Sequence, residues 1–110
     1  MKQYRIDELR LEDYEKLKAH LDERLGPSSI AGVYWSPLDP DLMDDVQAAH
    51  FDCQPFYYAV ALEPSFISFE FLIRTRTKMR CNCINYANER QRDSIMRFAD
   101  ELFEMLNILT

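Results

Sequence analysis

The sequence predicts an α+β fold in which an antiparallel sheet of about four strands carries helices packed mainly on one face. Three observations lead to this prediction. Apolar residues recur at helical spacing near both ends of the chain, over residues 11–25 and 95–109. Between them, apolar and polar side chains alternate over residues 66–75, with Leu72 as an exception, as they do in strands. The short gaps between these strands favour hairpins, which gives the element order α-β-α-β-β-β-α.

Two long helices follow from the apolar stripes. The first is expected over residues 11–25, and Gly26 followed by Pro27 supplies its stop signal. The last begins after Asn88, because Asn88 and Gln91 have the spacing of a capping box. Its wide stripe predicts a helix that lies flat across the sheet. The stripe consists of Ile95, Ala99, Leu102, Phe103, Leu106 and Leu109, widened by Phe98 and Met105.

A short helix is predicted over residues 40–49, because the residues before it, Ser36–Asp39, end the preceding strand. Asp39 is a suitable N-cap, and Pro40 fits the first helical position because its missing N–H is not needed there. Helical spacing predicts three buried positions, Leu42, Val46 and Ala49.

The strands are expected in four segments, with residues 3–9 ambiguous between a strand and a helix start. The four segments are 30–35, 56–62, 66–75 and 80–86. Residues 63–65 form a tight turn between the second and third, and residues 77–79 turn the chain into the fourth. Phe69 and Phe71 fall on the same face of their strand, and we expect both in one core cluster with Leu102.

Length and charge restrict the classes of protein that the chain can belong to. Its 110 residues are expected to form a single domain, 1–110. The net charge of −6 argues against nucleic acid and anionic membranes as partners. No apolar run is long enough to cross a bilayer, and the first residues lack the apolar core of a signal peptide. We therefore expect a cytoplasmic protein.

One set of residues has the chemistry of a metal site. His50 and Cys53 precede one predicted strand, and Cys81 and Cys83 open another that starts at the same end of the sheet. Three cysteines and a histidine are an accepted structural zinc set. Against this, strands two places apart lie about 10 Å from one another, and free cysteine is often a buried small hydrophobe. We expect core cysteines and no cofactor, with structural zinc as the alternative and redox chemistry as a further one.

A candidate partner-binding surface combines basic and aromatic side chains. Its basic residues occupy alternate positions at a hairpin tip, and they are Arg74, Arg76, Lys78 and Arg80. They are interpreted as a solvated edge that discourages strand aggregation or, alternatively, as a site for an anion or acidic partner. Tyr57 and Tyr58 are adjacent on a strand, so one of them lies off the helix-covered face. Tyrosine is enriched at interfaces.

These features predict a non-enzymatic protein that binds protein, in the form of a homodimer. The basic hairpin of one subunit is expected to meet the acidic segment 39–52 of the other, because residues 26–73 contain neither lysine nor arginine. The alternatives are the zinc protein and an enzyme with a pocket near Trp35, His50 and Asp52. The common phosphate-binding and hydrolase motifs are missing from the sequence.

Overall fold

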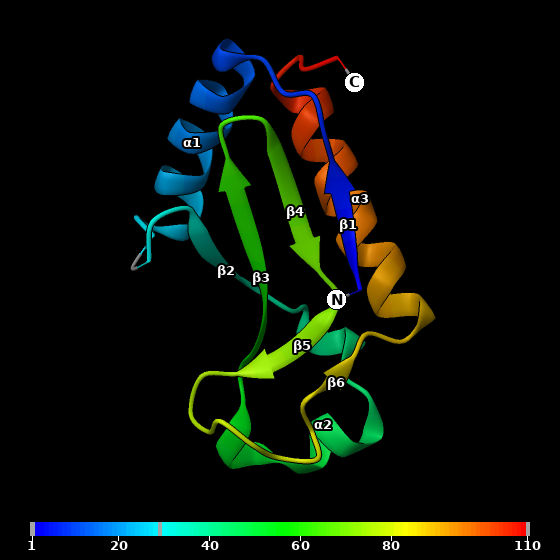
Figure 1. The fold of residues 1–110 in the computed structure, drawn as a ribbon. Coiled ribbons are helices and arrows are strands. Elements are labelled where there is room, and N and C mark those ends of the chain that lie inside the picture. The colour runs from blue at the N-terminus through cyan, green and yellow to red at the C-terminus, as the bar shows by residue number, and fades with distance from the viewer. Residues whose placement is uncertain (1, 29, 110) are drawn as a thin grey trace.

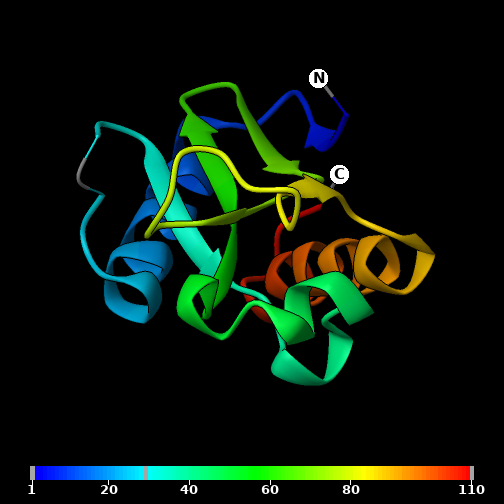
Figure 2. The same cartoon turned by 90° about the horizontal axis from the view of Figure 1, so that it is seen from below.

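Two long helices pack against one face of an antiparallel sheet in the computed structural model, which describes residues 2–28 and 30–109 (Figure 1). The helices are α1 (Leu11–Leu25) and α3 (Glu89–Met105). Figure 2 shows both of them on the same side of the sheet. The predicted α+β class is therefore confirmed.

The sheet has six strands rather than about four. They are β1 (Gln3–Ile6), β2 (Val33–Pro37), β3 (Phe56–Glu63), β4 (Phe66–Glu70), β5 (Leu72–Thr75) and β6 (Asn85–Tyr86). The central strand, β3, pairs with β2 along one edge and with both β4 and β5 along the other. β1 extends the sheet beyond β4, and β6 extends it beyond β5. All of these pairings are antiparallel.

The strand count differs from the prediction in three places. Residues 3–6 form β1, which resolves the ambiguity at the start of the chain. The predicted strand 66–75 divides at Phe71 into β4 and β5, because Phe71 turns its backbone away from β3 to bond with Lys2 and Ala87. The predicted strand 80–86 contracts to Asn85–Tyr86, and a turn occupies the residues before it.

Both helix-capping predictions are confirmed in detail. The Asn88 side chain accepts the Gln91 N–H at 2.9 Å, and the Asn88 N–H donates to the Gln91 side chain at 3.0 Å. The Asp39 side chain likewise accepts the Asp41 N–H at 2.9 Å, with Pro40 at the first helical position. The sequence therefore marks where these two segments begin.

The expected helix over residues 40–49 is instead two short helices. They are a 3-10 helix η1 (Pro40–Leu42) and α2 (Asp45–Ala49), the second capped by Asp44. The extended residues between them change the helical phase. Gln47 is consequently the buried residue, whereas Val46 is 43% exposed. Leu42 is half-buried and Ala49 is exposed, so the predicted burial is wrong at Val46 and Ala49.

The core lies between the sheet and the two long helices. Phe69 and Leu102 are both buried in it, and Phe71 packs against it while half-buried. The Phe98 ring of α3 makes edge-on contacts with Tyr58 and Phe69, at centroid distances of 6.4 and 6.1 Å. The stripe of α3 is shorter than predicted, because the helix ends at Met105 and leaves Leu109 exposed.

Candidate metal site and the neighbouring basic hollow

The four predicted metal-ligating residues meet at the end of the molecule opposite the β3–β4 turn. His50 follows α2, and Cys53 lies in the 3-10 helix η2 (Phe51–Cys53). Cys81 and Cys83 come from the loop between β5 and β6. One nitrogen and three sulfur atoms of these side chains all lie within 4.8 Å of one another. The structure thus brings together the whole set that the spacing suggested.

One sulfur–sulfur distance within this cluster is close to that of a tetrahedral site. His50 Nδ1 lies 3.1 Å from Cys81 Sγ, and Cys53 Sγ lies 3.9 Å from Cys81 Sγ. Zinc–sulfur bonds of about 2.3 Å in a tetrahedron separate two sulfur atoms by about 3.8 Å. The Cys53–Cys81 separation is close to this value, so the arrangement of the four side chains is compatible with a bound zinc ion.

The predicted separation of about 10 Å between the strands that carry the ligands argued against the cluster, but it does not apply to this fold. β5 pairs directly with the start of β3, where Thr75 faces Phe56. Residues 80–84 are not a strand, so the chain after β5 folds back toward η2. The sequence prediction placed Cys81 and Cys83 on the strand 80–86, and this placement is wrong.

Polar contacts hold the loop against η2 just before the two cysteines. The Thr75 hydroxyl donates to the Cys53 carbonyl oxygen at 2.6 Å, and the Thr77 hydroxyl donates to the Asp52 carbonyl oxygen at 3.2 Å. Lys78 Nζ pairs with Asp52 Oδ2 at 3.0 Å. The sequence analysis missed the two threonines, because nothing in the local pattern indicates contacts with residues 25 positions away.

A tight turn then directs both loop cysteines to the same point. The Ile84 N–H donates to the Cys81 carbonyl oxygen at 3.0 Å, which closes a four-residue turn over residues 81–84. Cys81 and Cys83 are the first and third residues of this turn. A C-x-C spacing that would be stretched in a strand is therefore compact in the loop.

The electrostatics of the cluster favour one thiolate. The Cys83 N–H and thiol both donate toward Cys81, and with His50 and Cys53 they lower the pKa of the Cys81 thiol to about 6. Burial, followed by the neighbouring Cys81 and Cys53, raises the pKa of Cys83 to about 12. Thiolates are the form that binds metal, so a cation entering the cluster meets a charged ligand at Cys81.

Burial divides the cluster into a closed side and an open side. Cys53 and Cys83 are buried, as expected for core cysteines, with exposures of 0% and 1%. His50 and Cys81 are half-buried and face the surface. An ion can thus enter from the His50 side and be enclosed by the two buried cysteines.

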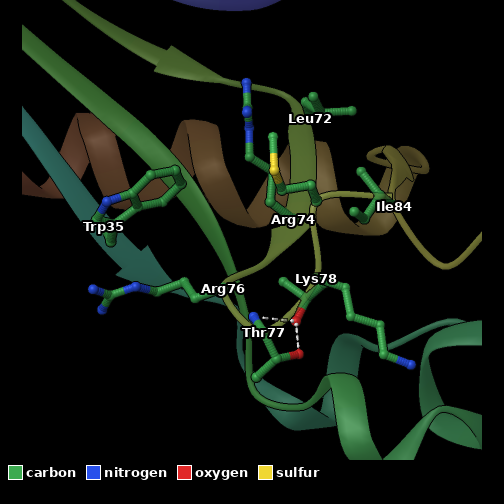
Figure 3. Close-up of a pocket in the computed structure, with 9 residues that line it drawn as sticks. Trp35, Leu72, Arg74, Arg76, Thr77, Lys78 and Ile84 are labelled. Atoms are coloured by element: carbon green, nitrogen blue, oxygen red, sulfur yellow. Dashed lines mark hydrogen bonds between the residues drawn. The ribbon is translucent and has the colours of Figure 1, made fainter. Parts of the chain in front are cut away.

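The same loop forms one wall of a hollow of about 440 Å³ on the sheet face away from α1 and α3. Its lining includes Trp35, Leu72, Arg74, Arg76, Lys78 and Ile84. Figure 3 shows the Trp35 indole on one side of the hollow and Leu72 and Ile84 on the other, with Arg74 between them. The hollow therefore combines an apolar interior with cationic groups.

The cations of the hollow differ in how strongly they are already paired. Arg74 contacts Glu70 at 3.3 Å, and Lys78 pairs with Asp52. The Arg76 guanidinium lies 5.5 Å from the centre of the Tyr57 ring, and within residues 2–28 and 30–109 no carboxylate pairs with it. Arg76 is thus the cation most available to a ligand.

The other predicted partner-binding residues lie in different environments. Tyr57 shares the outer face of the sheet with Arg74, its neighbour across the strands. Tyr58 points the other way and is 5% exposed, so it belongs to the core. Arg80 is exposed but does not line the hollow.

The residues of the predicted enzyme pocket do not all line this hollow. Trp35 lines the hollow, but His50 and Asp52 are not among its lining residues. His50 belongs to the cysteine cluster, and Asp52 forms a salt bridge with Lys78. Ile84 is a lining residue that the sequence analysis missed, because its place in a turn is not marked by any local pattern.

Comparisons with known proteins add no name to this site. No protein-family model matches the chain, and neither a curated protein nor a solved structure matches it. Within the described part of the chain, no helix is both long and apolar enough to cross a membrane.

Proposed function

We propose that this protein is a zinc-binding domain in which His50, Cys53, Cys81 and Cys83 hold a structural zinc ion. The observation that carries the proposal is the convergence of four ligand atoms within 4.8 Å from two segments about 30 residues apart. Thiolate and imidazole are ligands that suit zinc, and a site whose four positions all come from protein is of the structural type.

The role of the ion would be to fix the loop between β5 and β6. This loop ends in a strand of only two residues, so the sheet gives it little support. A bond from the loop to His50 and Cys53 would connect it to η2 and the end of α2. The ion would thereby also fix one wall of the basic hollow.

The test is the metal content and thiol reactivity of the purified chain. We expect close to one zinc per chain by elemental analysis, and thiols that react slowly until a chelator removes the metal. His50→Ala should lose most of the zinc. His20→Ala is the matched control, because His20 lies on α1 and is not part of the cluster, and it should keep the zinc.

Two outcomes would contradict the zinc proposal. One is a chain that takes up no zinc even after reduction and exposure to excess zinc. The other is a chain in which His50→Ala and His20→Ala retain the same amount of metal. A reversible disulfide between Cys53 and Cys81 in metal-free protein would favour the redox alternative instead.

A second proposed function is the binding of protein, which the hollow supports. Its interior is apolar and its edge is cationic, a combination found where aromatic anchors and charged rims meet at interfaces. The check is whether the chain associates with itself or with another protein through this face.

A further inference from the structure

We infer that the hollow receives Phe51 from a second copy of this chain, and that the contact is reciprocal, so that two copies close into a dimer. The inference rests on the proposed function in one respect, because the zinc ion would fix the loop that forms one wall of the hollow. The occupant, however, is identified by separate observations on the surface of the chain.

Three exposed apolar side chains lie on segments at the end of the molecule that carries the cysteine cluster. Phe51 is 81% exposed although it lies between the ligands His50 and Cys53. Met79, on the edge of the hollow, is 97% exposed, and Val46 on α2 is 43% exposed. Large apolar groups exposed together mark interaction surfaces, and aromatic residues are the usual anchors of such surfaces.

The segment that carries Phe51 is acidic in sequence, whereas the hollow is cationic. Acidic residues precede and follow Phe51, and they are Asp39, Asp41, Asp44, Asp45 and Asp52. The hollow presents Arg76 without a carboxylate partner among the described residues, next to Arg74 and Lys78. The same two charge types already attract one another within the chain, where Lys78 pairs with Asp52.

The interior of the hollow suits a phenyl ring. Its volume of about 440 Å³ lies in the range of pockets that enclose small ligands. Trp35, Leu72 and Ile84 supply apolar contacts, and an aromatic pair between Trp35 and an entering Phe51 adds to the burial of apolar area. Arg76 lies at the edge of the hollow below Trp35, and its guanidinium points outward, where it can face a carboxylate next to the ring (Figure 3).

The position of the two surfaces allows a closed dimer. η2, which carries Phe51, and the loop that walls the hollow both lie at the end opposite the β3–β4 turn (Figure 1). A two-fold axis near this end places Phe51 of each copy against the hollow of the other. Two identical contacts then form at once, and the assembly stops at two copies.

The experiment uses the full-length, zinc-loaded chain and two readouts. Sedimentation gives the mass, and the emission of Trp35, the only tryptophan in the chain, reports on the hollow itself. We expect a dimer at micromolar concentration, with Trp35 emission that shifts to longer wavelength as dilution separates the copies. Added salt should weaken the dimer without abolishing it.

Two variants test the two sides of the contact. Phe51→Ser removes the anchor, and Arg76→Glu opposes the acidic segment at the hollow. Each should raise the dimer dissociation constant by about tenfold or more, as expected for interface anchors. Leu11→Ser is the matched control, because Leu11 is also exposed (68%) but lies on α1, and it should leave the constant unchanged.

Mixing the two variants gives the decisive result. A dimer of one Phe51→Ser chain and one Arg76→Glu chain keeps one intact contact, whereas either variant alone keeps none. The mixture should therefore associate more tightly than either variant by itself. A mixture no tighter than its components, or a wild-type chain that stays monomeric at high concentration and low salt, would overturn the inference.

The outcomes also separate this inference from the zinc proposal. Zinc content is measured for every variant, so a loss of dimer in a chain that keeps its zinc concerns the hollow alone. A monomeric wild type that nevertheless binds a synthetic acidic peptide with a shift in Trp35 emission would assign the hollow to a different partner and refute self-pairing. Wild-type protein without zinc would contradict the proposed function instead.

Discussion

The two ends of this molecule are held together in different ways. Toward the β3–β4 turn, fully buried apolar side chains of the sheet and both long helices form the core, among them Leu17, Ile67 and Ile95. At the other end, residues 39–53 and 75–86 form short helices and loops. They contribute few fully buried side chains, among them Cys53 and Cys83, and are also held by hydrogen bonds from Thr75, Thr77 and Lys78. The first end obtains its stability from apolar burial, and the second depends on specific cross-links.

A buried pair of amides connects the two ends. Gln91, at the start of α3, donates to the Leu42 carbonyl oxygen at 2.8 Å and to the Gln47 side chain at 3.0 Å. Both glutamines are 1% exposed, and each also completes the capping box of its own helix. The pair therefore fixes α2, which leads to the proposed metal ligands, against the helix that covers the core.

The largest effect is expected from a change in the apolar end. Phe69→Ala should lower the free energy of unfolding by about 3–5 kcal/mol, because it leaves a cavity where a fully buried ring was. Urea denaturation followed by circular dichroism measures this. Leu11→Ala, at an exposed side chain (68%), is the control and should change stability by less than about 1 kcal/mol. Equal losses in the two variants would refute this division of the molecule.

Removal of zinc should affect the other end, with a somewhat smaller cost. With free zinc at a hundredfold excess over its dissociation constant, chelation should lower the free energy of unfolding by about 3 kcal/mol. Hydrogen exchange should accelerate at residues 50–53 and 76–86 and stay slow in the middle of α1 and α3. Acceleration spread evenly over α1 would show that the ends are not independent.

The Gln91–Gln47 pair that connects the two ends should contribute less to the free energy of unfolding than the apolar core or the zinc ion. Gln91→Ala removes the side-chain half of the α3 capping box and the hydrogen bonds to the Leu42 carbonyl oxygen and to Gln47 Oε1, which keeps only the Asp44 N–H. This loss should cost about 1–3 kcal/mol. Exchange should also become faster in α2. Gln3→Ala, at an exposed position of β1, serves as the control. An unchanged unfolding midpoint for Gln91→Ala would contradict the bridging role.

The smallest effect concerns acid stability at the apolar end. Hydrogen bonds from Arg10 hold the pKa of Asp13 below its ordinary value of 3.8. A carboxyl pKa that is lowered in the folded state stabilises the fold at pH values above 3.8. This contribution is lost as the pH falls through the folded-state pKa. Asp13→Asn should flatten the decline of the urea midpoint below about pH 4. A decline as steep as that of the wild type would contradict this contribution.

Local features of the chain were predictable because they depend on neighbouring residues. The start of α3 follows from Asn88 and Gln91, and the end of α1 follows from Gly26. The alternation in residues 66–70 placed Phe69 on the core face. The ligand residue types and their H-x-x-C and C-x-C spacings were also visible in the sequence, whereas their meeting was only one of several possibilities.

The sequence by itself determined the α+β class, the two long helices and which residues had the chemistry to bind a metal. Only the tertiary structure decided that the strand after Glu70 bends away into β5, that residues 80–84 form a loop, and that its two cysteines reach His50 and Cys53. The reason is the separation along the sequence between the residues that interact. Helix caps and strand alternation are set by residues a few positions apart, but the Thr75–Cys53 bond joins residues 22 positions apart. Such a bond forms only after β3 and β5 have paired, so no local pattern encodes it.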